Sequence, residues 1–528
     1  MTTVDAVVVG SRVNGPVAAA ELALAGWSVA LVERNRDLGG FIATEERTLP
    51  GYLHDTYSSW HPLFLAGPVF ARLRQPLAEH GLQYRNTEGW LCASVADDGR
   101  VTAAHRDPVV TADGFAVAAD RTAYLASLRR LGDNIGPISG LMSSELRSPT
   151  LLRHVAGLLR IGGRAGLESW LRSIVTSGRG YVRANFRGHE VDHLLTPWLL
   201  HAGLSPDHAG GGFMVPLLAA TLHGYGTPVV AGGAGRFVEA FRSLLDTLTV
   251  PIETGTPVER ILVERGRAVG VPAGNRVIRA RRAVPASVTP TALYGSLLPQ
   301  GTVNARVREE AHRFRYGRAA MQIHVALSAP LGWRDERLGT MPIVHLSDGA
   351  ASTGIARAEA EAGLLPARPT VVVGQQFLLD PVRVPPGRAA LWLQLQEIPY
   401  APRGDVAGVL DVGQGWEEDL VRGYADRILD RIAVHAPDLR AKVLAVDVVT
   451  PTQLAEHNPN AVDGDPYGGC AELHQSFLWR PLPSSGRHAT AVRGLWHIGA
   501  ATHPGSGLGG GSGHMVATRL TRRQARRR

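Results

Sequence analysis

The sequence predicts an α/β fold that begins with a Rossmann-like unit. Residues 4–9 form a short β-branched run, which is typical of a buried parallel strand. A glycine turn over residues 10–15, an Ala- and Leu-rich helix that ends at Gly26 and a second apolar strand over 28–32 follow it. Glu33 stands directly after the second strand. This order of strand, turn, helix, strand and acid is the plan of a dinucleotide-binding unit.

The glycine turn departs from the usual G-x-G-x-x-G fingerprint at one position. Gly10 and Gly15 occupy the first and last glycine positions, and Arg12 occupies the middle one. The middle glycine normally lets the backbone approach a pyrophosphate with no side chain in the way. Arg12 therefore leaves two alternatives open. Its positive charge could bind the diphosphate directly, or its large side chain could obstruct the nucleotide and weaken binding. Glu33 keeps the expected spacing for a carboxylate that accepts from ribose hydroxyls, 18 residues beyond Gly15.

Two later segments support the same fold class. Residues 256–271 alternate like a hairpin around Gly266, and residues 277–284 predict a further strand. Residues 495–498 predict a strand, 499–513 a glycine-dense turn and 514–520 a helix, an arrangement that suits an anion or a carbonyl oxygen. Residues 505–510 also match G-x-G-x-x-G. No acidic residue follows at the required distance, so we predict neither a second nucleotide site nor a separate NAD(P)H site.

Composition limits the class of protein. With 528 residues, 45% of them hydrophobic and 19% charged, the chain is globular. Two cysteines, Cys92 and Cys470, exclude a disulfide scaffold and fit a cytoplasmic setting. The net charge of +8 comes almost entirely from scattered arginines, so we expect no nucleic-acid partner. We find no signal peptide and no run of roughly 18 apolar residues that would span a membrane. The basic terminal segment RLTRRQARRR leaves contact with anionic lipid open beside a frayed end.

Several motifs together resemble one family of flavoproteins. GSRVNG, E-R-N-R-x-L-G-G and T-E-E-x-x-x-P-G-Y stand near the N-terminus, and W-R-P-x-P and G-A-A-T-H-P-G-x-G near the C-terminus. They are similar to the phytoene desaturases, carotenoid isomerases and their relatives, most closely to the branch called pyridine nucleotide-disulfide oxidoreductase domain-containing protein 2. Ala501 replaces the usual glycine of the last motif. Because motifs at both ends match, the resemblance is more specific than a match at one end.

The resemblance implies FAD as the cofactor and a two-domain architecture like that of amine oxidases and phytoene desaturases. A Rossmann-like FAD-binding domain would be discontinuous (residues 1–70, 225–300 and 465–528), with an inserted α+β substrate-binding domain (71–224 and 301–464). In this family the diphosphate lies at the first turn, the glycine pair beside the ribityl chain, the backbone of Val258 at the adenine and the last loop at the flavin. The implied cofactor-binding residues are Gly10, Arg12, Asn14, Gly15, Glu33, Arg34, Gly39, Gly40, Val258, Gly499, Ala500, His503, Gly507 and Leu508.

A flavin performs hydride chemistry itself, so the reaction can proceed with no acid or base residue. The candidates for a catalytic role are His54, Asp55, Tyr57, His61 and His503, which follow the glycine pair or lie in the last loop. A structural hydrogen-bonding role is the alternative for each histidine. No cluster with metal-ligand spacing occurs, and neither a Ser-His-Asp arrangement nor G-x-S-x-G can be identified.

These observations favour an FAD-dependent oxidoreductase: a dehydrogenase, desaturase or isomerase of a hydrophobic small molecule that passes electrons to oxygen or a quinone. A second hypothesis is a non-catalytic protein of the same fold that binds a lipid or a prenylated partner, which Arg12 favours. A third is a flavin amine oxidase, which the W-R-P-x-P and T-H-P-G motifs fit less well. Glu33 and the Gly39–Gly40 pair argue against the second hypothesis, because a protein without FAD would not need them.

Overall fold

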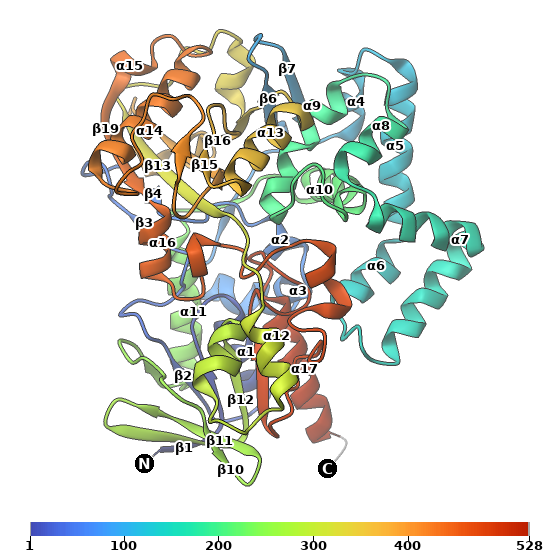
Figure 1. Cartoon of the computed structure of the whole chain (residues 1–528), viewed down its shortest axis with the longest axis vertical. Coiled ribbons are helices and arrows are strands. Elements are labelled where there is room, and N and C mark those ends of the chain that lie inside the picture. The colour runs from blue at the N-terminus through green and yellow to red at the C-terminus, as the bar shows by residue number, and fades with distance from the viewer. Residues whose placement is uncertain (1, 526–528) are drawn as a thin grey trace.

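Strand β1 (Thr2–Val9) lies at the centre of one of two seven-stranded sheets in the computed structural model, which describes residues 2–525 (Figure 1). It pairs in parallel with β2 on one side and with β12 on the other, and β20 pairs in parallel with β12. The hairpin β10–β11 extends the sheet beyond β12, and β9 extends it beyond β2. The other strands of this sheet are β2 (Val29–Val32), β9 (Ile252–Glu253), β10 (Leu262–Glu264), β11 (Arg267–Ala273), β12 (Arg276–Ser287) and β20 (Leu495–Ile498).

Helices α1 (Asn14–Leu24), α11 (Gly235–Thr247) and α17 (Gly511–Ala525) cover one face of this first sheet. Helix α1 packs closely on α17, since a side chain at Gly513 would place its Cβ 2.1 Å from the carbonyl oxygen of Asn14. The first and last segments of the chain therefore meet at the carboxyl ends of β1 and β20, where ligands bind in open α/β sheets.

The second sheet has the order β19-β13-β17-β16-β14-β6-β7. One face packs on helix α14 (Glu418–Ala433) through an apolar core that includes Ile323, Val344 and Leu393. The other face looks toward the helices of the chain's middle region and carries polar residues among apolar ones. Its strands are β6 (Trp90–Val95), β7 (Val101–His105), β13 (Ala319–Leu327), β14 (Ile343–Leu346), β16 (Val371–Gly374), β17 (Ala389–Ile398) and β19 (Val443–Val449).

A helical lobe stands beside the second sheet. Its elements are α4 (Pro108–Asp113), α5 (Ala118–Asp133), α6 (Ile135–Met142), α7 (Thr150–Val175), α8 (Gly178–Asn185), α9 (Glu190–Leu195), η1 (Pro197–Ala202) and α10 (Gly211–Tyr225). Helices α6 and α7 project from the body of the molecule (Figure 1). Helix α7 is kinked at Gly163, whose φ of 64° is outside the helical range.

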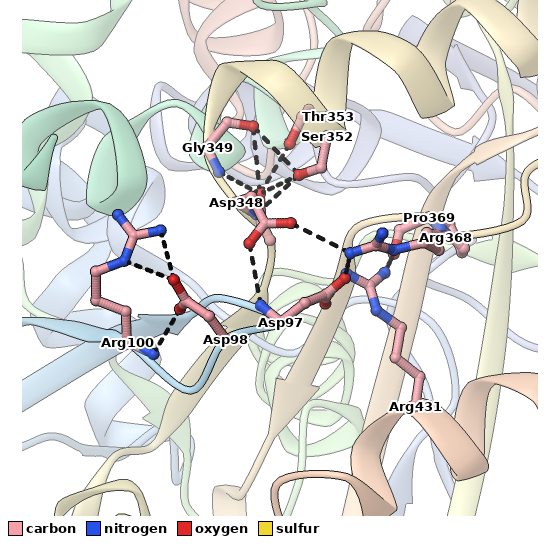
Figure 2. Close-up of polar contacts among 11 residues, drawn as sticks. Asp97, Asp98, Arg100, Asp348, Gly349, Ser352, Thr353, Arg368, Pro369 and Arg431 are labelled. Carbon is pink, nitrogen blue, oxygen red and sulfur yellow. Dashed lines mark hydrogen bonds and ion pairs between the residues drawn. The ribbon is translucent and has the colours of Figure 1, made fainter.

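A network of ion pairs and hydrogen bonds joins several chain segments at one end of the second sheet (Figure 2). Asp97, in the turn between β6 and β7, pairs with Arg368 and accepts from Nη2 of Arg431 at 3.1 Å. The backbone amide of Asp97 donates to Asp348 at 3.0 Å, just before helix α13 (Ala350–Glu361). Four chain segments are thereby held at one point, and α14 contributes Arg431 to it.

The α/β fold predicted from the sequence is confirmed. The hairpin at Gly266 and the strands at 277–284 and 495–498 form as expected. The last helix begins at Gly511, three residues before the expected start, because its glycines allow close packing on α1. Within the described residues no helix is both long and apolar enough to cross a membrane. The end of the basic tail, residues 526–528, lies outside the described residues.

Candidate functional site

The turn between β1 and α1 has the backbone that a nucleotide-binding turn needs. Gly10 adopts a φ of 88°, a conformation that L side chains rarely take. A Cβ at Gly15 would lie 1.9 Å from the carbonyl oxygen of Gly10, so only glycine fits there. Asn14 and Gly15 open α1, whose first turn contains no acidic residue. The amide groups of this helix end therefore face a position suited to an anion.

Glu33 is held at the edge of this turn by three donors. Its Oε2 accepts from the amide of Ser11 at 2.7 Å and from the Ser11 hydroxyl at 2.6 Å. Among residues 2–525, its Oε1 accepts only from the amide of Asn35, at 2.8 Å, and so keeps a lone pair for another donor. The role of Ser11 was missed from the sequence, because the fingerprint leaves that position undefined.

Arg12 turns its side chain away from the turn. Its Nη2 donates to the carbonyl of Pro466 at 2.6 Å, and its guanidinium lies 5.2 Å from the ring centre of Phe41. Burial lowers the pKa of Arg12 to about 10, although nearby Asp465 opposes the shift, so Arg12 stays charged at neutral pH. A Cβ at Gly40 would approach Cγ of Arg12 to 3.3 Å, so the glycine pair leaves room for this arginine.

A cavity of about 340 Å³ opens beside the turn. Six of the residues implied by the family resemblance line it, and thirteen further lining positions were missed, including seven in its polar wall. The six are Gly10, Arg12, Glu33, Arg34, Gly40 and Val258. The seven are Ser11, Asn35, Thr256, Ser287, Asn458, Pro459 and Asn460.

The Asn458–Asn460 wall of the cavity comes from far along the sequence. Nδ2 of Asn460 donates to the Ser287 carbonyl at 3.2 Å, and Nε2 of His457 lies 2.9 Å from the Gly40 carbonyl. The short H-N-P-N segment, with Pro459 between two asparagines, is a turn signal that sequence reasoning could have noticed.

The remaining implied cofactor residues lie around α1 and the last loop and do not line this cavity. Gly499 donates to the hydroxyl of Ser512 at 3.1 Å, and the carbonyl of Ala500 accepts from Nη2 of buried Arg480 at 2.7 Å. Asn14 accepts from the amide of Gly513 at 3.1 Å. A Cβ at Gly39 would meet Val238, and Gly507 lies beside Leu63. Leu508 packs on the core between α1 and α11. The last two of these residues are Gly15 and His503.

Asp55 lies in a buried ionic network. It accepts from Nη1 of Arg383 at 2.7 Å and from the amide of Ala234 at 2.7 Å. Arg383 also pairs with Asp380 at 3.1 Å. Burial raises the pKa of Asp55, but Arg383 and the hydrogen bonds outweigh it and leave the pKa below its usual value. These contacts connect strand β4 (His54–Asp55) to the second sheet's loop at residues 376–383.

The candidate histidines also have partners within the protein. His54 faces the Thr48 hydroxyl at 2.8 Å, and His61 faces the Tyr84 hydroxyl at 3.1 Å. Nε2 of His503 lies 3.0 Å from the carbonyl of Leu141. Burial lowers the pKa of each of the three to about 4, so all are neutral at pH 7.

Tyr57 contacts His457, the residue that precedes the Asn458–Asn460 wall of the cavity. Its ring stacks on His457 with 4.7 Å between ring centres and lies 5.1 Å from the ring of Phe41. Burial raises the pKa of its hydroxyl to about 12, so the phenol stays protonated at pH 7.

Comparison with known proteins agrees with this geometry. Residues 8–75 match the family described as an NAD(P)-binding Rossmann-like domain. The mouse pyridine nucleotide-disulfide oxidoreductase domain-containing protein 2 is 26% identical over 97% of this chain and 92% of its own length. A limonene dehydrogenase subunit of Castellaniella defragrans is 23% identical over 97% of this chain and 93% of its own. A lycopene-forming phytoene desaturase of Paracoccus is 33% identical over 26% of this chain and 25% of its own.

Solved structures share the fold. A Methanosarcina mazei oxidoreductase superposes with a TM-score of 0.58 at 16% identity, covering 98% of this chain and all of its own. A redesigned putrescine oxidase superposes with a TM-score of 0.60 at 15% identity, covering 98% and 99%. The chain thus shares its fold with a class of two-domain oxidoreductases. Within that class, the resemblance to the phytoene desaturases and to the pyridine nucleotide-disulfide oxidoreductase domain-containing protein 2 branch is confirmed.

Proposed function

We propose that this chain binds FAD and acts as a dehydrogenase, desaturase or isomerase on a hydrophobic small molecule. The observation that carries the proposal is the cavity whose wall joins the glycine turn at Gly10, the carboxylate of Glu33 and the backbone at Gly40. When bound, FAD supplies hydride or electron transfer, and the protein supplies binding and orientation. Electrons then pass to oxygen or a quinone.

The cavity residues fit the adenosine half of FAD. Oε1 of Glu33 has a lone pair for a ribose hydroxyl, and the amides at the start of α1 suit the diphosphate. The backbone of Val258 would lie beside the adenine. Arg12 contributes positive charge to the cavity wall without filling the space above Gly10, because its guanidinium is bonded to Pro466.

The flavin half is assigned to the glycine pair and the last loop. Gly39 and Gly40 would lie along the ribityl chain, and the segment from Gly499 through Ala500 and His503 to Gly507 and Leu508 would lie at the flavin ring. The two sheets support the proposed division into an FAD-binding domain (1–70, 225–300 and 465–528) and a substrate-binding domain (71–224 and 301–464).

A hydrophobic substrate agrees with the names of two relatives, one a limonene dehydrogenase and the other a phytoene desaturase. We further propose a cytoplasmic protein that contacts membranes peripherally. Helix α7 exposes Leu152, Ile161 and Leu171 to solvent by 70, 46 and 56%. Exposed arginines stand among these side chains, at positions 153, 160, 164 and 172. Apolar side chains interleaved with cations suit the surface of an anionic bilayer.

The first experiment is the visible spectrum of the purified protein before and after heat denaturation. We expect flavin absorption bands, and FAD in the supernatant after heating. Addition of a substrate under anaerobic conditions should then bleach the oxidised flavin bands. A colourless protein that stays colourless after incubation with FAD would contradict the proposal and favour the non-catalytic binding protein.

A further inference from the structure

A row of polar side chains crosses one face of the second sheet. Gln322 on β13 pairs with Gln394 on β17, which pairs with Val372 on β16. Val372 pairs with His345 on β14, and His345 with Ser94 on β6. Adjacent strands lie roughly 4.8 Å apart, so the row from Gln322 to Ser94 is about 19 Å long. Residues one position along these strands face the apolar core on α14.

This face contains buried polar atoms that have no hydrogen-bond partner among residues 2–525. Within the row these atoms are Oε1 of Gln322, Nδ1 of His345 and Oγ of Ser94. On the same face of β17 they are Nε1 of Trp392 and Oε1 of Gln396. Buried polar groups are normally paired, and each unpaired one costs about 1–3 kcal/mol. Five of these atoms lie on one sheet face, where a bound ligand would supply partners for several of them at once.

The elements opposite the row leave one of its members, Gln394, partly exposed. Nε2 of His201, in η1, lies 3.0 Å from Nε2 of His345. Nε2 of Gln396 donates to the hydroxyl of Tyr467 at 2.6 Å. Gln394, His201 and Tyr467 are half-buried, so solvent reaches this face at Gln394, whereas Val372 and His345 are fully buried.

The row also adjoins the proposed cofactor site. Nε2 of Gln322 donates to the carbonyl of Tyr57 at 3.1 Å. The Tyr57 ring stacks on His457, and Nε2 of His457 lies 2.9 Å from the Gly40 carbonyl at the cavity. A molecule bound along the row would thus lie between the second sheet and the segment that leads to the proposed flavin.

We propose that this polar row recognises the substrate, and that the substrate is an apolar molecule with a neutral hydrogen-bonding group such as a hydroxyl, and neither a pure hydrocarbon nor a carboxylate. This inference rests on the proposed function, because it places the substrate beside the FAD site. The unpaired atoms include donors and acceptors, which a hydroxyl satisfies together.

The electrostatics of the row favour a neutral group. The row itself contains no Asp, Glu, Lys or Arg. Burial lowers the pKa of His201 to about 4 and that of His345 well below its usual value, so neither histidine carries a charge at pH 7. The buried cation whose charge acts on Tyr467 is Arg357, and it already pairs with Glu361 at 3.1 Å. A carboxylate buried in the row would compete for that partner, and burial of an unpaired charge is costly.

The test compares head groups on a constant skeleton. One series is cis-9-octadecene, oleyl alcohol and oleate, and a second is limonene, perillyl alcohol and perillate. Binding to the purified protein is measured by calorimetry, and FAD content is determined separately. We expect the alcohol to bind at least tenfold more tightly than the hydrocarbon and the acid in at least one series. Equal binding, preference for the acid or hydrocarbon, or no binding in both series would overturn the proposal.

Two variants connect this preference to the row. Ser94→Ala and Gln396→Leu should each reduce the preference for the alcohol over the hydrocarbon to threefold or less, with hydrocarbon binding unchanged. Gln75→Leu makes the same change as the second variant at an exposed position of helix α3 (Pro68–Glu79) and should leave the preference intact. The Oγ of Ser94 has no hydrogen-bond partner among the described residues, so Ser94→Ala removes no hydrogen bond within the protein. This variant therefore tests the row even if Gln396→Leu fails to fold. Retention of the preference in a folded Ser94→Ala variant would overturn the assignment.

The proposed function can fail separately from this inference. A colourless protein that prefers the alcohol would contradict FAD binding and still support the row as a ligand site. A yellow protein that binds all head groups equally would keep the oxidoreductase proposal and overturn the row alone.

Discussion

Glu33 combines a fixed position with an acceptor that is still available. The amides of Ser11 and Asn35 and the Ser11 hydroxyl hold its carboxylate, and one lone pair of Oε1 remains for a ribose hydroxyl. A hydrogen bond to a charged group contributes about 1.5–3 kcal/mol. We therefore expect Glu33→Gln to weaken FAD binding by about tenfold to a hundredfold.

This prediction is checked by titrating apoprotein with FAD and by measuring the FAD retained after gel filtration. Glu79→Gln, on exposed α3, is the matched control and should retain FAD like the unmodified protein. Equal FAD affinity in Glu33→Gln and the control would show that Glu33 does not contact the ribose.

Arg12 illustrates where prediction from the sequence ends. The sequence identifies the turn and the replaced glycine, because both depend on local spacing. The position of the guanidinium depends on the carbonyl of Pro466, 454 residues later, and on the ring of Phe41. The same limit applies to Asn458 and Asn460, which only the tertiary fold brings to the cavity.

At the scale of elements, the buried Asp55–Arg383 pair connects strand β4 to the second sheet's loop at residues 376–383. Nη2 of Arg383 also donates to the carbonyl of Val230 at 2.7 Å, which adds strand β8 (Val229–Val230) to the same junction. Removal of one charge would leave Arg383 buried with only Asp380 to balance it. Breaking a buried pair in this way costs about 3–5 kcal/mol. We expect Asp55→Asn to lower the thermal unfolding midpoint at pH 7.

The pH dependence gives this prediction a sign. The pKa of folded Asp55 is below its usual value, so the ionised carboxylate stabilises the fold above the unfolded pKa. That contribution is lost as pH falls through the folded pKa. The midpoint of Asp55→Asn should therefore approach that of the unmodified protein in acid. Asp419→Asn, whose side chain is fully exposed, should change neither the midpoint nor its pH profile. A midpoint difference that is constant down to pH 2 would contradict the role assigned to this ion pair.

Elements with strong local patterns were predictable, and elements that depend on contacts were less so. The predicted strand at residues 495–498 has the bounds of β20, because it is a short run with apolar Leu495, Trp496 and Ile498 that ends at Gly499. Helix α17 begins earlier than its sequence suggests, since glycine has low helix propensity but Gly513 fits against Asn14. The network of Asp55 and Arg383 joins residues 328 positions apart and has no local signal.

At the scale of the molecule, the sequence patterns at the two ends of the chain predicted that both ends belong to one domain. Each end has a strand, a glycine turn and a helix, and the two sets meet at one edge of the same sheet. The helical lobe was not predicted as a unit. The kink of helix α7 at Gly163 and its projection from the body depend on packing, which has no local signal in the sequence (Figure 1).

The projecting α7 leads to a prediction about the whole molecule. Leu152, Ile161 and Leu171 are exposed and stand among arginines. Burying each apolar side chain at a membrane surface contributes up to about 1.5–3 kcal/mol, and each arginine near anionic lipid about 1 kcal/mol. We expect the protein to float with vesicles that contain phosphatidylglycerol, and to float less as salt is raised.

The triple variant Leu152→Ser, Ile161→Ser and Leu171→Ser should lower the floating fraction at least fivefold while FAD content stays unchanged. Val409→Ser is the control, because Val409 is 74% exposed in the loop between β18 (Gly404–Asp405) and α14, away from α7. Flotation of the triple variant at the level of the control would assign membrane contact to another surface. Absence of flotation in the unmodified protein at low salt would exclude α7 as a membrane contact, and a hydrophobic substrate would then have to reach the polar row from solution.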